Sequence, residues 1–374
     1  MGRNYYIYIG SKAFFDSKVT TKISESYFNK EADQFLDKVK LSDEKRQRGL
    51  PFTDEDKSEI LVLKNDNYNG IIETAHDRLG SLIEELTSEN STIFLHNPPT
   101  KLLSDLKSQA QINIVALNIE QETYTIKREP HAFSKNIETI RSRIFGQDNA
   151  ISEVSKSMWY LTSVDRKKPY VIMLYGNSSL GKTELVREIS ASFYEGKFVE
   201  KHLSMFRNDT YSFYFFGDKP NRRCLGFDLL ERESNLVFLD EIDKCPDHFL
   251  SAFYTLFDNT IFIDSTYEVD ISGLLIILTS NYKNLGEIKN SLGLPIFYRI
   301  DKFIKFDDFD EKTIYEVTVN EINAHLHDLP KSITFDDVYH LASNVIMSSD
   351  ENARTIKNKI QEVVEEILFQ EVQC

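Results

Sequence analysis

The sequence has few cysteines and no long hydrophobic run. Its three cysteines have an odd count and no C-x-x-C spacing, which argues against a disulfide framework and a cysteine-bound metal. They are Cys224, Cys245 and Cys374. The longest strongly apolar stretch, residues 271–279, is too short to cross a bilayer, and the N-terminal MGRNYYIYIG lacks the layout of a signal peptide. We therefore expect a cytoplasmic protein with reduced thiols and no membrane association.

Basic charge is also scarce. The 374 residues include 44 lysines and arginines against 59 aspartates and glutamates, for a net charge of −15. Proteins that bind nucleic acid usually present a broad basic surface, so nucleic acid is disfavoured as a partner. Hydrophobic residues make up 41% of the sequence, which is enough for ordinary cores in two or three domains.

A phosphate-binding pattern stands in the middle of the chain. Residues 170–175 predict a buried parallel strand, and residues 182–194 have the 3.6-residue period of a helix. Between them, the pattern G-x-x-x-x-G-K-[ST] is complete in Gly176, Gly181, Lys182 and Thr183. Such a pattern also arises by chance, but the strand before it and the helix after it are the context that a P-loop (Walker A motif) requires.

The chemistry of phosphate binding explains each residue type in this loop. The glycines let successive backbone N–H groups turn toward a phosphate at the positive end of the helix dipole. Lys182 is expected to reach the β- and γ-phosphates of ATP and to neutralise charge in catalysis, and Thr183 to offer its hydroxyl to Mg²⁺. The predicted nucleotide contacts span the whole loop: Gly176, Asn177, Ser178, Ser179, Leu180, Gly181, Lys182, Thr183 and Glu184.

A second apolar stretch ends in two acids. Residues 235–243 read NLVFLDEID. An acidic pair after a strand is, by itself, usually a solvated strand end. After a complete P-loop, however, such a strand places an aspartate beside Mg²⁺ and a glutamate beside the attacking water. We therefore assign Asp240 to the metal and Glu241 to the water (Walker B), and we predict hydrolysis of Mg²⁺-bound ATP.

Residues 1–135 predict a separate α/β domain. Four runs rich in β-branched and aromatic residues are strand-like, and two helical patterns lie between the later ones. The expected strands are 5–10, 59–63, 92–96 and 111–117, and the expected helices are 70–86 and 100–108. No catalytic set of residues stands out. The domain is a partner-recognition module or a structural cap, and the sequence leaves both open.

From residue 136 onward the sequence resembles a known family. The order GQDNAI, GNSSLGKT, LVFLDEID, ILTSN and PIFYRID is similar to that of the AAA+ ATPases, and within them to the second ATPase module of the Clp-type unfoldases and disaggregases. The resemblance implies an α/β fold of the AAA+ P-loop NTPase type, with a parallel sheet flanked by helices over 136–306 and a small helical lid over 307–374. It also implies a homo-oligomeric ring, which we expect to be a hexamer.

The resemblance assigns two further catalytic residues. Asn281 ends the LLIILTSN stretch and would be sensor 1, which hydrogen-bonds the γ-phosphate or the attacking water. Arg299 stands where Clp-type enzymes place the arginine finger that completes the neighbouring subunit's site. The alternative for Arg299 is a salt bridge with Asp301 on a solvated turn.

Three more positions are assigned to the nucleotide by the same resemblance. Arg354 falls at the sensor 2 position at the start of a lid helix, although Asn352 replaces the family's glycine. Ile144 and Phe145 occupy the adenine-contacting position, where apolar residues could also be core.

The sequence departs from the Clp-type pattern in one loop. These unfoldases grip polypeptides in the central pore through an aromatic residue between glycines. The comparable stretch here is residues 215–230, FFGDKPNRRCLGFDLL, in which Arg222 and Arg223 take the gripping position. Paired arginines favour carboxylates or phosphates over generic chains. The alternatives are that Phe215, Phe216 or Phe227 does the gripping, or that the arginines make intersubunit contacts.

Three functions are therefore weighed. The first is a ring-forming Mg²⁺-ATPase that remodels a protein partner chosen by residues 1–135. The second is an ATP-controlled oligomeric switch or scaffold that works with an effector protein in a regulatory or defence system. The third, remodelling of nucleic acid, is disfavoured by the net charge.

Overall fold

The computed structural model describes residues 2–25, 32–126, 128–206, 212–220, 222–346 and 351–373, so Cys374 lies outside it. The chain divides into two compact units. The first comprises Met1–Thr125, Arg207–Asn235 and Ser251–Ser272, and the second comprises Ile126–Phe206, Leu236–Leu250 and Gly273–Cys374. Two excursions from the second unit therefore complete the first. The division into functional domains at residues 135 and 306 stays a prediction.

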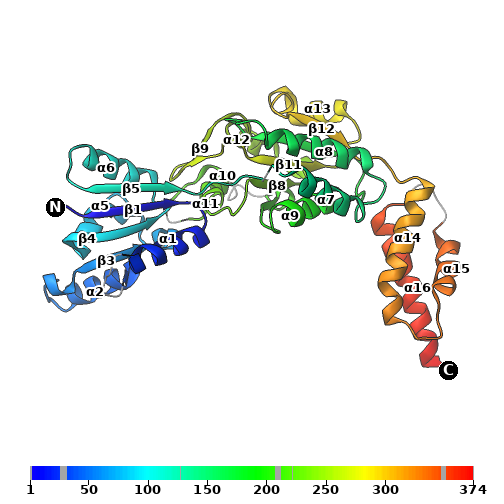
Figure 1. Cartoon of the computed structure of the whole chain (residues 1–374), viewed down its shortest axis with the longest axis horizontal. Coiled ribbons are helices and arrows are strands. Elements are labelled where there is room, and N and C mark those ends of the chain that lie inside the picture. Colours follow the sequence, from blue (N-terminus) through cyan, green and yellow to red (C-terminus); the bar gives the residue numbers. More distant parts are fainter. Residues whose placement is uncertain are drawn as a thin grey trace. The chain divides into compact units, whose positions relative to one another are not determined.

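A five-stranded parallel sheet is the centre of the first unit (Figure 1). Its strands are β1 (Asn4–Ile9), β2 (Asp33–Gln34), β3 (Ser58–Leu63), β4 (Thr87–His96) and β5 (Ala116–Gln121), in the order β2-β3-β4-β1-β5. Its helices are α1 (Lys12–Glu25), α2 (Phe35–Gln47), α3 (Asn65–Asn69), α4 (Glu73–His76), α5 (Leu79–Leu86) and α6 (Thr100–Gln111).

Period-two alternation along the central strands makes two cores. On β3, Leu61 and Leu63 pack with residues of α2, α5 and α6, whereas Ile60 and Val62 pack with residues of α1. Three of the four predicted strands are confirmed, at β1, β3 and β4. The prediction of a strand over 111–117 was wrong, because α6 continues to Gln111 and the strand begins only at Ala116. The single helix expected over 70–86 is broken into α4 and α5.

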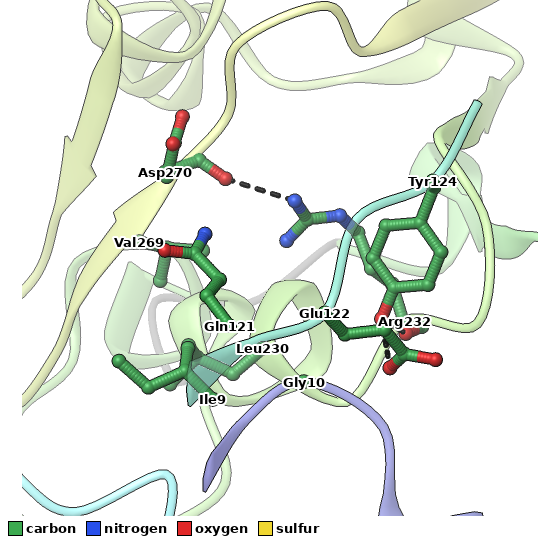
Figure 2. A pocket seen from close by; sticks show the side chains of 9 residues that line it. All are labelled: Ile9, Gly10, Gln121, Glu122, Tyr124, Leu230, Arg232, Val269 and Asp270. Carbon is green, nitrogen blue, oxygen red and sulfur yellow. Dashed lines mark hydrogen bonds between the residues drawn. The ribbon is translucent and has the colours of Figure 1, made fainter. Parts of the chain in front are cut away.

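The excursions add short elements to the first unit. They are α10 (Ser212–Phe216), α11 (Leu225–Leu230), α12 (Ala252–Asp258) and a hairpin of β9 (Ile261–Ile263) and β10 (Glu268–Asp270). The Asn65 side chain donates to Glu231 at 2.8 Å. A small pocket lies where these elements meet the ends of β1 and β5 (Figure 2). There the buried Arg232 guanidinium donates to the carbonyl oxygen of Asp270 at 2.9 Å, and its charge lies over the ring of Tyr124.

A second parallel sheet is the centre of the second unit. Its strands are β6 (Tyr170–Tyr175), β7 (Val199–His202), β8 (Leu236–Asp240), β11 (Leu275–Ser280) and β12 (Lys302–Lys305), in the order β12-β6-β11-β8-β7. Its helices include α7 (Pro130–Arg141), α8 (Asp148–Leu161), α9 (Lys182–Phe193) and α13 (Leu285–Phe297). Tyr175 pairs with Ser280, and His202 with Asp240, so the carboxyl ends of these strands meet at one edge. In open α/β sheets ligands bind at this edge.

Three helices end the chain, in the stretch 307–374 where the sequence predicted a helical region. They are α14 (Glu311–His325), α15 (Phe335–Val345) and α16 (Ala353–Gln373). Side-chain caps explain where the first two begin, because Asp310 accepts a hydrogen bond from the Thr313 N–H and Thr334 accepts one from the Asp337 N–H. Throughout the described part of the chain, no helix is both long and apolar enough to cross a membrane.

Candidate active site

The predicted phosphate loop runs from β6 into α9. Gly176 has a φ of 141°, and a Cβ placed on it would lie 2.4 Å from the carbonyl oxygen of Phe306. Gly181 has a φ of 95°, a conformation that side chains disfavour. Among the described residues, the atom nearest to a Cβ placed on Gly181 would be in the Ile144 side chain, at 3.9 Å. Glycine is thus required at position 176 by both conformation and space, and at position 181 by conformation.

The side chain of Lys182 is buried and folds back onto the backbone of the phosphate loop. The residue is 7% exposed, and its Nζ donates to the carbonyl oxygens of Gly176 at 2.8 Å and Asn177 at 2.6 Å. Burial lowers the pKa of Lys182 to about 8, against the opposing effect of two nearby aspartates. The contacts of this buried cation are therefore mainly neutral carbonyl oxygens. Phosphate oxygens make stronger, charge-assisted bonds to such a group.

Both carboxylate oxygens of Asp240 have contacts. Asp240 ends β8 and is 8% exposed. Its Oδ1 accepts hydrogen bonds from the hydroxyls of Thr183, at 3.4 Å, and Thr279. Its Oδ2 lies 3.2 Å from Nδ1 of His202, the last residue of β7. Three strands and α9 thus converge on this carboxylate.

The oxygen atoms at this point fit Mg²⁺. The Thr183 hydroxyl and the Asp240 carboxylate are hard ligands of the kind that Mg²⁺ takes, and this ion usually needs only one or two protein ligands besides waters and phosphate oxygens. The donor set therefore suits the predicted cation.

Glu241 follows Asp240 in a left-handed conformation, with φ 59° and ψ 50°. Its N–H donates to Oγ1 of Thr279 at 3.0 Å, and its carbonyl oxygen accepts from the N–H of Lys244 at 2.9 Å. The side chain is half-buried. This conformation is uncommon for a residue other than glycine, so the surrounding structure must hold it in place.

Asn281 directly follows β11 and contacts the loop lysine. Its Oδ1 accepts from Lys182 at 3.3 Å, while its Nδ2 lies 3.4 Å from Oδ2 of Asp243. The backbone N–H of Asn281 also approaches Oδ1 of Asp243, at 3.3 Å. Asp243 therefore holds the amide nitrogen, which leaves the amide oxygen directed at Lys182.

The first turn of α16 lies against the same loop. The N–H of Ala353 donates to the carbonyl oxygen of Ser179 at 3.1 Å. Asn352 caps this helix, because its Oδ1 accepts from the N–H groups of Arg354 and Thr355 at 3.0 and 3.1 Å. Asparagine thus has a capping role where the family has glycine. Arg354, whose side chain is exposed, directly follows Ala353, the residue that contacts the loop.

The other predicted nucleotide residues differ in their exposure. Ile144 is buried and Phe145 is half-buried. Asn177 donates to the Asp308 carboxylate at 2.7 Å. Of the remaining loop positions, Leu180 is buried, whereas Ser178 and Glu184 are exposed.

Arg299 lies just after α13 and is half-buried. Its Nη1 donates to the carbonyl oxygen of Pro295 at 2.8 Å. Asp301, its alternative partner in the sequence, receives hydrogen bonds from Arg166 at 2.6 Å and from the Val171 N–H at 2.9 Å. The structure thus brings Lys182 and Asn281 into direct contact, and likewise Thr183 and Asp240, while Arg299 has a backbone partner in the preceding helix, α13.

Sequence reasoning missed Thr279, His202 and Asp243. Thr279 is a polar residue within the apolar run LLIILTSN, and Asp243 is the last acid of LDEID. These two polar positions were the sequence signals from which Thr279 and Asp243 could have been predicted as site residues. His202 carried none, because its importance depends on the pairing of β7 with β8.

The two arginines of the stretch 215–230 have acidic partners. Nε of Arg223 lies 2.5 Å from Oδ1 of Asp228, which is 5% exposed and also accepts from the Tyr214 hydroxyl. Arg222 pairs with Asp218 at 2.9 Å on the surface. Among the phenylalanines weighed as alternatives, Phe215 and Phe227 are buried and Phe216 is 46% exposed.

A parallel sheet, a glycine-rich loop between strand and helix, and an acid that ends another strand of the same sheet define a P-loop NTPase. Comparison with known families narrows this class. Residues 172–308 match the family described as "ATPase family associated with various cellular activities (AAA)". The chain therefore carries an AAA ATPase domain, as the sequence predicted.

The curated relatives include Clp-type chaperones, to which the similarity is weak. The chloroplastic chaperone ClpD of Arabidopsis thaliana is 26% identical over 41% of this chain and 18% of its own length. The human mitochondrial disaggregase is 26% identical over 38% of this chain and 22% of its own length. ClpB of Porphyromonas gingivalis is 23% identical over 55% and 28%. The matched region thus spans less than a third of each of these relatives.

Proposed function

We propose that the protein is a ring-forming AAA+ ATPase that hydrolyses Mg²⁺-ATP and remodels a protein partner in the cytoplasm. The observation that carries the proposal is the approach of the Thr183 hydroxyl to Asp240, beside a loop whose lysine is buried among carbonyl oxygens. Hydroxyl, carboxylate and ammonium together suit a Mg²⁺-triphosphate. The relatives include a chaperone and a disaggregase, which supports a protein as the target.

In this proposal each site residue has one task. Lys182 binds the β- and γ-phosphates, and Glu241 orients the water for in-line attack on the γ-phosphate. Asn281 contacts the γ-phosphate or that water through its amide. Thr183 and Asp240 would hold Mg²⁺, which supplies neutralisation of phosphate charge. Ile144 and Phe145 receive the adenine, and Arg354 contacts the nucleotide from α16.

We include a ring in the proposal because of the role proposed for Arg299. In other NTPases an arginine finger raises the rate by about 10³ to 10⁵. We assign this role to Arg299 in the neighbouring subunit's site, which requires a homo-oligomer, taken here as a hexamer. Residues 1–135 would select the partner.

A switch or scaffold is the second candidate function. It is favoured by the pairing of Arg223 with the buried Asp228. An arginine that forms an ion pair within its own chain is poorly suited to bind a polypeptide that is being threaded. ATP would then drive assembly, and an effector protein would supply the chemistry.

The test compares ATP turnover with unfolding of a fluorescent model substrate, in the native chain and in Glu241→Gln. The remodelling proposal expects ATP-dependent loss of substrate fluorescence, absent in Glu241→Gln. ATP-dependent assembly with slow turnover and no unfolding would favour the switch. A native chain that neither binds nor hydrolyses ATP would contradict both.

A further inference from the structure

Thr279 joins the two acids of the site. It lies on β11 and is 2% exposed. Its hydroxyl donates to Oδ1 of Asp240 and accepts from the backbone N–H of Glu241, with 3.0 Å between nitrogen and Oγ1. A hydroxyl has one proton and two lone pairs, so both bonds form at once. One side chain thus contacts the residue assigned to the metal and the residue assigned to the water.

Each of these bonds fixes something that the reaction needs. The bond to Asp240 orients a buried carboxylate, which could otherwise rotate about its side-chain torsions. The bond from Glu241 holds a left-handed turn that a glutamate rarely adopts, and this turn sets the direction in which the Glu241 side chain leaves the backbone. A shift of about 1 Å in a catalytic group is enough to cost a large factor in rate.

We propose that Thr279 is a positioning residue for ATP hydrolysis, which aligns Asp240 and Glu241 through one hydroxyl. This inference rests on the proposed function, because it concerns the residues assigned there to Mg²⁺ and to water. An isosteric valine keeps the volume but removes the Thr279 donor from Oδ1 of Asp240, which then keeps only the longer contact with Thr183, and it leaves the Glu241 N–H without its acceptor. Serine keeps the hydroxyl and loses only a methyl group.

The chain offers a matched control in Thr318 on α14. It is 4% exposed, and within the described residues its Oγ1 has no hydrogen-bond partner. Thr318→Val therefore removes a buried hydroxyl that makes no hydrogen bond within the described residues. The comparison of Thr279→Val with Thr318→Val separates the two hydrogen bonds from the general effect of a polar-to-apolar change in the core.

The experiment uses the full chain with Thr279→Val, Thr279→Ala, Thr279→Ser and Thr318→Val. Two quantities are measured: kcat at saturating Mg²⁺ and ATP, and the Mg²⁺ concentration at half-maximal binding of a fluorescent ATP analogue. We expect Thr279→Val and Thr279→Ala to lower kcat about tenfold or more and to raise the Mg²⁺ midpoint about threefold or more. Thr279→Ser and Thr318→Val should stay within about threefold of the native chain in both.

Equal kcat and equal Mg²⁺ midpoints for the alanine and serine variants would overturn the inference. This pair also decides the matter if the valine variant does not fold, since alanine adds no bulk. If the native chain fails to hydrolyse ATP, or if Glu241→Gln is as fast as the native chain, it is the proposed function that fails. The role of Thr279 is then still tested by comparing the Mg²⁺ midpoints of its variants with that of the native chain. Nucleotide binding that does not respond to Mg²⁺ would overturn the inference as well.

Discussion

The hydroxyl of Thr183 lies 3.4 Å from Oδ1 of Asp240, although the two residues are 57 positions apart in the chain. Thr183 is in the first turn of α9 and Asp240 ends β8, two strands away from the strand that leads into the loop. Only the strand order of the sheet brings them together. The two sides of the proposed metal site are therefore assembled by the fold itself.

Replacement of Lys182 by methionine should abolish tight ATP binding. The ammonium is the buried cation of the loop, and charge-assisted bonds contribute about 1.5–3 kcal/mol each, so we expect affinity to fall at least about a hundredfold. Isothermal titration calorimetry measures this directly. Lys289→Met, at an exposed position of α13, is the control and should bind as the native chain does.

Gly176→Ala should disrupt the loop more than Gly196→Ala does. Both glycines have positive φ, 141° and 78°, but a Cβ at Gly176 would lie 2.4 Å from a backbone oxygen of Phe306, whereas a Cβ at Gly196 would have no described residue within 4 Å. The second variant thus carries only conformational strain, about 1 kcal/mol. We expect ATP affinity to fall at least tenfold for Gly176→Ala and to be retained for Gly196→Ala. Equal affinities would contradict this account of the loop.

The stability of the first unit should fall with acidification because of His96. Burial lowers the pKa of His96 to about 4 from 6.5, so between these values the unfolded chain binds a proton that the folded chain does not. The free energy of unfolding therefore decreases as pH falls through this window, by up to about 3 kcal/mol.

Part of this loss is offset by Glu231, 3.6 Å away, because burial raises the pKa of its carboxyl. Lys64, Asp16 and Asp66 also act on the His96 pKa, with smaller effects. Urea unfolding from pH 7.5 to 4.5 should give a shallower pH dependence for His96→Gln than for the native chain. The same slope in both would rule out His96 as the cause.

Arg223 should matter for stability and Arg222 should not. Removal of Arg223 leaves the buried Asp228 carboxylate with one donor fewer, so Arg223→Ala should cost about 2 kcal/mol, less than a fully buried pair because the arginine itself is largely exposed. The Arg222 pair is on the surface, and its loss should cost less than about 0.5 kcal/mol. Chemical denaturation of both variants tests this, and an equal cost would argue against a structural role for Arg223.

Much of the second unit could be predicted because its signals are local. The run before the loop became β6, the periodic stretch after it became α9, and the helical region predicted over 307–374 became α14, α15 and α16. Lys182 and Thr183 could be proposed because the loop is one continuous pattern with a known mechanical purpose.

What the sequence could not predict depends on pairing between distant strands. Thr279 and His202 contact Asp240 only because β11 and β7 flank β8 in register. Likewise, nothing local indicates that 207–235 and 251–272 belong to the unit of residues 1–125. The edge strand β5 was misplaced because Ile112 and Ile114, which look like core, are 67% and 54% exposed.

The central claim is an active site shared between subunits, and one mixing experiment tests it most directly. Glu241→Gln should bind ATP and barely hydrolyse it, and Arg299→Ala should assemble but be slow. Mixed with ATP, the two variants should recover activity, because some interfaces pair an intact Glu241 with an intact Arg299. Normal hydrolysis by Arg299→Ala alone, from a chain that stays monomeric with ATP, would contradict the shared-site account.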